Sequence, residues 1–180
     1  MRSIIFAAFA ALIGFTSCND ETKTAGAQDD VAQKNLEISR MVSRAFQTGD
    51  VSLVDSAVAD DFLDHTDRGD KVGKDSLKAM INMVRTNFKD MKVEVISEAA
   101  NTEYVFQWLR YTGTSDGTMG MPAGPYDMKG LEISRHKDGK IVEHWAYMDV
   151  GEMMKMMNPN ANSTIPPMPD QRKDSAAKSK

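Results

Sequence analysis

Residues 138–149 read Asp138-Gly139-Lys140-Ile141-Val142-Glu143-His144-Trp145-Ala146-Tyr147-Met148-Asp149, a tight turn followed by a long apolar segment. Asp-Gly pairs are favoured in two-residue hairpin turns, because glycine adopts a positive φ without a steric cost. One strand over residues 131–136 and another over 140–149 are expected to flank the turn. The segment therefore predicts a β-hairpin, and the rest of the chain can be interpreted around it.

Side chains along the second strand of this hairpin alternate between two faces. One face carries Ile141, Glu143, Trp145, Tyr147 and Asp149, and the other carries Val142, His144, Ala146 and Met148. An acidic side chain at the end of an aromatic-rich strand is suited to acid–base chemistry, but Asp149 can also cap the short helix expected after it. On the hairpin alone, both interpretations of Asp149 stay open.

The first 18 residues have the layout of an export signal. A basic start at Met1-Arg2 precedes an apolar run over residues 4–15, which is short for a membrane span and typical of a secretory signal. The single cysteine, Cys18, resembles the lipidated cysteine of a bacterial lipobox, with Phe15 in place of the usual leucine. The alternative is an ordinary signal peptide with an incidental cysteine. A lone cysteine has no disulfide partner in an oxidising compartment, which favours lipidation and predicts an exported bacterial lipoprotein, anchored at the periplasmic face or cell surface.

Composition separates one domain from its two flanking segments. Residues 19–30 are polar and are expected to form a flexible tether, whereas residues 159–180 are proline-rich and lack the apolar content to fold, which predicts a disordered tail. Residues 31–158 then form a single domain. The net charge of −4, without a basic cluster, argues against a nucleic-acid partner. The 14 methionines indicate either soft core packing or a pliable ligand pocket.

Helical periodicity comes first along the domain and strand periodicity follows. Helices are expected over residues 31–48, 51–57 and 76–87, and strands over 91–98, 103–112 and 126–136, with a long loop at 113–124. This order predicts an α+β fold. On the strand at 103–112, one face is expected to carry Tyr104, Phe106, Trp108 and Arg110.

Several segments, taken in order, resemble the SnoaL-like polyketide cyclase and ester cyclase family of the nuclear transport factor 2-like superfamily. They are Ala59-Asp60-Asp61-Phe62-Leu63-Asp64-His65, then Phe88-Lys89-Asp90-Met91, Gln107-Trp108 with Arg110, the glycine-rich loop at 113–124, and Gly139 to Trp145 with Asp149. The resemblance covers most of residues 31–157. It implies a cone-shaped fold in which N-terminal helices pack on a curved antiparallel sheet around a deep, mostly apolar pocket.

The same resemblance implies the site residues. In characterised cyclases of this family, an aspartate near the end of the last strand is the general acid/base of an intramolecular aldol closure, and by motif that role falls on Asp149. An apolar pocket would raise the pKa of such a carboxylate towards the working pH. His65 and His144 are the supporting catalytic candidates, His144 only if a bulge turns it to the same face as Asp149.

The expected ligand contacts come from the pocket wall and from the loop. The substrate-binding candidates are Trp108, Arg110, Trp145, Tyr147, Met119 and Met121. Arg110, on a largely aromatic face, would need Asp149 or Asp64 as a carboxylate partner if buried. The three histidines lie on different elements without ligand spacing, so no metal is expected. The family resemblance implies an enzyme that uses no cofactor.

Two functions from different classes remain open. The first is a cofactor-independent enzyme that cyclises, isomerises or hydrates a small apolar carbonyl compound, with Asp149 as acid/base. The second is a non-catalytic small-molecule-binding lipoprotein module with the same fold. A third hypothesis is a scaffold homodimer, because sheets of this superfamily often pair face to face.

Overall fold

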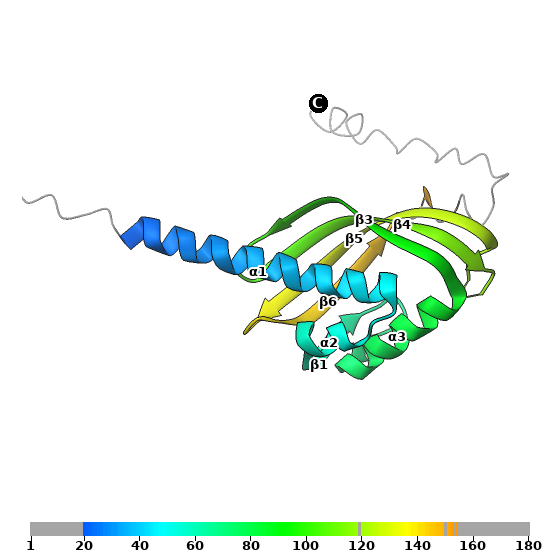
Figure 1. The fold of residues 1–180 in the computed structure, drawn as a ribbon, viewed down its shortest axis with the longest axis horizontal. Helices are drawn as coiled ribbons and strands as arrows, with labels where there is room; N and C mark the ends of the chain where they lie inside the picture. The colour runs from blue at the N-terminus through cyan, green and yellow to red at the C-terminus, as the bar shows by residue number, and fades with distance from the viewer. Residues whose placement is uncertain (1–19, 119, 150, 153, 155–180) are drawn as a thin grey trace, which may run out of the picture.

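The structure, a computed structural model, describes residues 20–118, 120–149, 151, 152 and 154. Two helices, two strands and a third helix come first, and a long antiparallel meander follows (Figure 1). The elements are α1 (Asp20–Thr48), α2 (Ser52–Ala57), β1 (Val58–His65), β2 (Lys71–Val72), α3 (Lys74–Asn87), β3 (Phe88–Ala100), β4 (Tyr104–Asp116), β5 (Ala123–Lys137) and β6 (Lys140–Met148). The predicted α+β class is confirmed.

All six strands form one curved sheet in the order β2-β1-β6-β5-β4-β3. Neighbouring strands run antiparallel, as expected, except β1 and β6, which are parallel. β1 is separated from β6 by the whole meander, and a connection of that length permits parallel pairing. The junction matters because it brings the end of β1 beside the middle of β6.

The predicted hairpin forms between β5 and β6. Asp138 and Gly139 both have positive φ, at 51° and 72°, as a two-residue turn of the type favoured by sheet twist requires. A bulge follows, because Arg135 pairs with Glu143 whereas His136 pairs with Ile141. The extra residue precedes His144, so the alternation of faces from His144 to Met148 is undisturbed.

Two expected segments differ from the structure. α1 begins at Asp20, so the segment predicted to be a flexible tether is mostly helical, and the N-terminal part of α1 extends beyond the sheet (Figure 1). The loop expected over residues 113–124 is shorter, because β4 continues to Asp116 and β5 begins at Ala123. Residues 1–18, with Cys18, and the tail at 159–180 lie outside the described residues.

The main core joins the helices to β1 and to the start of β6. Its fully buried members include Ala45 on α1, Phe62 on β1 and Ile81 on α3. A second cluster around Leu109, Tyr111 and Tyr126 lies further along the meander. A cavity lies between these two clusters and is lined by members of both.

Candidate active site

A cavity of about 500 Å³ lies between α1, α3 and the inner face of the sheet. Its wall is mostly apolar, as in many small-molecule sites. The apolar lining includes Val42, Phe46, Phe62, Leu77, Met80, Val84, Leu109, Met128 and Met148, and the polar lining includes Ser39, Ser43, Asp64, Gln107, Tyr111, Glu132, Ser134 and His144. Most of these polar side chains belong to two hydrogen-bonded groups, whereas Gln107 donates to Glu98.

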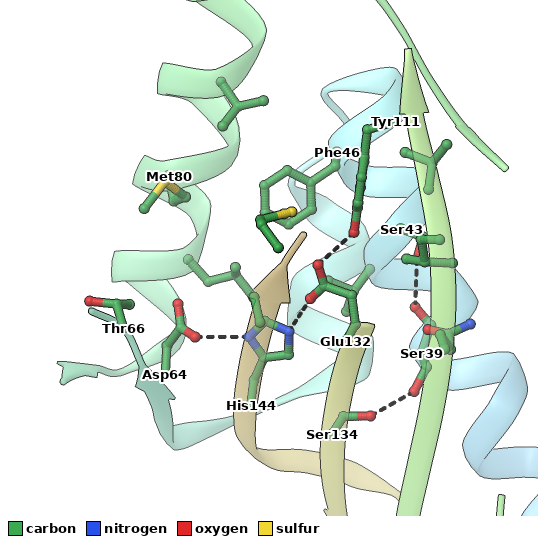
Figure 2. A pocket seen from close by; sticks show the side chains of 18 of the residues that line it. Ser39, Ser43, Phe46, Asp64, Thr66, Met80, Tyr111, Glu132, Ser134 and His144 are labelled. Atoms are coloured by element: carbon green, nitrogen blue, oxygen red, sulfur yellow. Dashed lines mark hydrogen bonds and ion pairs between the residues drawn. The ribbon is translucent and has the colours of Figure 1, made fainter. Parts of the chain in front are cut away.

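The larger polar group is centred on His144. Its Nδ1 lies 2.8 Å from Asp64 Oδ1, and its Nε2 contacts Glu132 Oε2 (Figure 2). The hydroxyl of Tyr111 donates a 2.5 Å hydrogen bond to the other Glu132 oxygen. We call these four side chains the His144 network.

Sheet register assembles this network from four strands. Asp64 on β1 pairs directly with His144 on β6 across the parallel junction, although 80 positions separate them in the sequence. Glu132 on β5 lies diagonally opposite His144, because His144 pairs with Ser134. Tyr111 projects from the inner face of β4, where it is buried.

The two carboxylates keep His144 protonated. Burial is the largest single influence and lowers the pKa of the imidazole, but it is outweighed by the charge of Glu132, the hydrogen bonds to Asp64 and Glu132, and the charge of Asp64. Together these raise the pKa of His144 from 6.5 to about 10. His144 is therefore an imidazolium at neutral pH, and both of its nitrogens donate hydrogen bonds.

Tyr111 keeps its proton as well. Burial, followed by the negative charge of Glu132 and the hydrogen bond to it, raises the pKa of the phenol well above 10.0. Both oxygens of Glu132 and both nitrogens of His144 are engaged within the network. Asp64 differs, because its Oδ2 makes no hydrogen bond to any residue that the structure describes, and Asp64 lines the cavity. Asp64 Oδ2 is thus the free acceptor that the network presents to a ligand.

His65, a predicted catalytic residue, lines the edge of the cavity without joining the network. Its ring stacks on Trp145 with centroids 4.7 Å apart, and its Nδ1 lies 3.1 Å from Asp70 Oδ1. Adjacent residues of a strand point to opposite faces, so Asp64 does not orient His65. Asp64 is hydrogen-bonded to His144 rather than to its neighbour His65.

Asp149 is not in the cavity, contrary to the prediction. It is exposed, follows the last residue of β6 and does not contribute to the lining. Its Oδ1 accepts a 3.0 Å hydrogen bond from the backbone N–H of Glu152, which is the capping role left open by the sequence. His144 and Met148 line the cavity from β6, whereas Asp149, directly after β6, does not.

The predicted ligand-binding aromatic residues lie on the outer face of the sheet. Trp108 is 49% exposed and Tyr147 is 56% exposed, and Trp145 stacks on His65. Arg110 is also outside the cavity and makes two hydrogen bonds, of 2.8 and 2.6 Å, to Asp127, rather than to Asp64 or Asp149.

Strand alternation grouped these side chains correctly, but the face that carries them, predicted to be the inner face of the sheet, is the outer one. The face that lines the cavity from β4 carries Gln107, Leu109 and Tyr111. Of the two methionine candidates, Met121 packs against the cluster around Tyr126 and Met119 lies outside the described residues.

The sequence analysis missed several polar side chains of the cavity, among them Glu132, Tyr111, Ser39 and Ser134. Glu132 and Ser134 share a face of β5, but the Asp138-Gly139 turn alone would pair Ser134 with Glu143, and only the bulge between Arg135 and His136 brings His144 onto that face. Within the described residues there is no group of three or more His, Cys, Asp or Glu side chains arranged to hold a metal ion. No helix in the described part of the chain is both long and apolar enough to cross a membrane.

The helices, the curved six-stranded sheet and the cavity between them define a nuclear transport factor 2-like fold. Residues 36–156 match the model of the SnoaL-like polyketide cyclases, and the chain belongs to this family. No functionally curated protein matches the sequence.

Solved structures with the same fold include proteins of different described activities. IdmH, a putative polyketide cyclase from Streptomyces antibioticus, is 24% identical with a TM-score of 0.59, over 68% of this chain and 97% of that one. A putative SnoaL-like polyketide cyclase from Jannaschia sp. CCS1 is 18% identical with a TM-score of 0.63, over 71% and 93%. An LEH-like epoxide hydrolase from M. tuberculosis is 16% identical with a TM-score of 0.58, over 70% and 90%. At these identities the likeness concerns the fold alone.

Proposed function

We propose that this protein binds a small, mostly apolar carbonyl compound in the cavity and moves a proton on it, as a cofactor-independent cyclase or isomerase does. One observation carries the proposal: a carboxylate with an unengaged oxygen, Asp64, is hydrogen-bonded to an imidazolium inside an apolar cavity. In this proposal Asp64 takes the acid/base role that the family resemblance assigned to Asp149.

The proposed step begins with Asp64 Oδ2 removing a proton from the carbon next to the ligand carbonyl. The C–H bond breaks, its electron pair forms the enolate, and the proton resides on Asp64. Negative charge thereby moves from the carboxylate to the enolate, close to the positively charged His144, in a cavity whose wall is mostly apolar. In a ring closure, Asp64 returns the same proton to the alkoxide that forms, so the protein is unchanged at the end.

Glu132 and Tyr111 act as positioning residues in this scheme. Glu132 holds His144 from the side opposite Asp64, and Tyr111 occupies the remaining oxygen of Glu132. An imidazolium held on both sides cannot rotate away from Asp64 without breaking a charge-assisted hydrogen bond. The base is therefore held in one geometry before the ligand arrives.

The test is hydrogen–deuterium exchange at the activated carbon of 2-tetralone, a compact apolar ketone, in D₂O with NMR detection. The protein should accelerate exchange, and Asp64→Asn should remove the acceleration. Asp61→Asn, the same chemical change at an exposed position of β1, is the matched control and should keep the wild-type rate. Exchange no faster than in buffer, or equal rates for the wild type and Asp64→Asn, would refute the proposal.

A binding module without turnover is the second candidate, and one feature favours it. Most polar atoms of the His144 network already satisfy one another, which is also how a buried polar network stabilises a fold without chemistry. For this candidate, 2-tetralone would bind to the wild type and to Asp64→Asn, and neither would accelerate exchange.

We also propose that the chain is exported and anchored to a membrane through a lipid on Cys18. The support is the arrangement of residues 1–18, in which a short apolar run ends at the single cysteine. Mass spectrometry of the mature N-terminus should find diacylglycerol on Cys18. A mature chain with unmodified Cys18 would contradict the anchor.

A further inference from the structure

A second polar group lines the cavity at some distance from Asp64. Ser39 on α1 and Ser134 on β5 have their hydroxyl oxygens 3.0 Å apart (Figure 2). His136 Nε2 lies 3.1 Å from Ser39 Oγ and 3.0 Å from Ser134 Oγ. All three residues are buried, and both serines line the cavity whereas His136 lies behind them.

Ser39, Ser134 and His136 form a triangle of hydrogen bonds, in which one serine hydroxyl hydrogen has no acceptor. His136 Nδ1 is buried without a partner among the described residues, and orphaned N–H groups are rarer than orphaned acceptors, which places the ring hydrogen on Nε2. The Nε2–H then donates to the serine oxygens, and one serine hydroxyl donates to the other. The remaining hydroxyl hydrogen has no acceptor inside the triangle and is available to a molecule in the cavity.

The charge of the site selects a neutral partner for this donor. Burial lowers the pKa of His136 from 6.5 to about 4, so the triangle carries no positive charge at neutral pH. The His144 network contributes two carboxylates and one imidazolium to the same cavity. An anionic ligand would meet negative charge there, and the triangle offers no cation to compensate for it.

Sheet register fixes the spacing between the two polar groups. Asp64 pairs with His144, and His144 pairs with Ser134, so Asp64 and Ser134 are aligned across three adjacent strands. Their backbones therefore lie two strand spacings apart, about 10 Å. A ligand that lies between the two side chains has its two polar atoms closer together than that, because a hydrogen bond of about 3 Å separates each polar atom from the side chain that it contacts.

We propose that Ser39 and Ser134 form a second subsite, which donates a hydrogen bond to a neutral oxygen at the end of the ligand opposite the carbonyl beside Asp64. The preferred ligand is thus an uncharged, largely apolar molecule with two oxygen functions, a ketone and an ether, ketone or hydroxyl oxygen. This inference rests on the proposed function, since it adds to the ligand assigned there.

Two ketones of nearly equal shape test the subsite. 6-Methoxy-2-tetralone carries an ether oxygen where 6-ethyl-2-tetralone carries a CH₂ group, and their dissociation constants can be compared by calorimetry. A purely apolar wall would bind the ethyl compound more tightly. The subsite should instead favour the methoxy compound by roughly 2- to 10-fold, the value of one net hydrogen bond.

Variants locate the effect on the two serines. The double variant Ser39→Ala/Ser134→Ala should reverse the preference in favour of the ethyl compound. Ser43→Ala is the matched control, because Ser43 also lines the cavity but its hydroxyl donates to the Ser39 carbonyl, so its preference should equal that of the wild type. The wild-type comparison decides the question even if the double variant does not fold.

The proposal is overturned if the wild type binds the ethyl compound as tightly as the methoxy compound, if the double variant keeps the methoxy preference, or if neither ketone binds. Its failure is distinct from that of the proposed function. A methoxy preference without accelerated exchange would remove the catalytic role of Asp64 and leave the subsite. Exchange that depends on Asp64, without a methoxy preference, would remove the subsite and leave the catalytic role of Asp64.

Discussion

Raising the pH should destabilise this protein through His144 before its lysines titrate. The pKa of His144 is raised from 6.5 to about 10 in the folded state. Between these values the folded protein holds a proton that the unfolded chain has released. The contribution of His144 is therefore complete below the unfolded pKa and is lost as the pH rises through the folded pKa.

The slope of this loss follows from proton linkage. One proton of difference changes the free energy of unfolding by about 1.4 kcal/mol per pH unit, so the fall between pH 7 and pH 9 should be roughly 2–3 kcal/mol. The side chain of His144 is 23% exposed, which is too little for solvent to screen most of this effect. Urea denaturation at a series of pH values measures it.

His144→Gln supplies the reference, since glutamine can hydrogen-bond to a carboxylate but does not titrate. At pH 7 the variant should be less stable by about 3–5 kcal/mol, because Asp64 and Glu132 lose the cation between them. Its free energy of unfolding should then change little between pH 7 and pH 9, whereas that of the wild type falls. Parallel curves for the two proteins would refute the electrostatic description of the network.

Three further predictions concern other parts of the fold. Burial lowers the pKa of His136 to about 4. The free energy of unfolding should therefore fall by about 1.4 kcal/mol per pH unit as the pH drops from about 6.5 towards 4. Thermal melting of the wild type and of His136→Phe at pH 7 and pH 5 would show whether His136 is the cause. Ile81→Ala should lower the free energy of unfolding by about 2–5 kcal/mol in chemical denaturation, because Ile81 is fully buried. Val72→Ala, at a 69% exposed position, should change it by less than about 0.5 kcal/mol. Equal effects would contradict the placement of Ile81 in the hydrophobic core. Gly113→Ala would place a Cβ 2.7 Å from the Lys89 carbonyl oxygen and should lower stability by about 1–3 kcal/mol, and a melting temperature equal to that of the wild type would disprove this close approach.

The sequence predicted local structure well, because local structure depends on neighbouring residues. The positive φ values at Asp138 and Gly139 are those that an Asp-Gly turn requires. The apolar spacing of Leu77 and Ile81 matches the buried side of α3. Polar composition misled at residues 19–30, where a flexible tether was expected and α1 extends back to Asp20.

Sequence periodicity could not predict which face of the sheet is the inner one. Alternation separates Phe106 and Trp108 from Gln107 and Leu109, but it does not state which pair faces the helices. The aromatic side chains suggested an inner wall, yet Trp108 is half exposed and Gln107 is buried. The buried face is decided by contacts with α1 and α3, which are distant in the sequence.

The sequence also could not predict the pairing of Asp64 with His144. It depends on the parallel junction between β1 and β6, and nothing in the local pattern of either strand specifies a partner 80 residues away. The two side chains were each noted as part of a family-like segment. Their contact, and with it the move of the proposed base from Asp149 to Asp64, needed the tertiary structure.

A head-to-head comparison of Asp64→Asn and Asp149→Asn tests the central claim most directly, with the rate of deuterium exchange into 2-tetralone as the measured quantity. The account predicts that Asp64→Asn lowers the rate to that of buffer, since its carboxylate faces the cavity, and that Asp149→Asn retains the wild-type rate, since its carboxylate accepts the N–H of Glu152 in solvent. Loss of exchange in Asp149→Asn with full exchange in Asp64→Asn would contradict it.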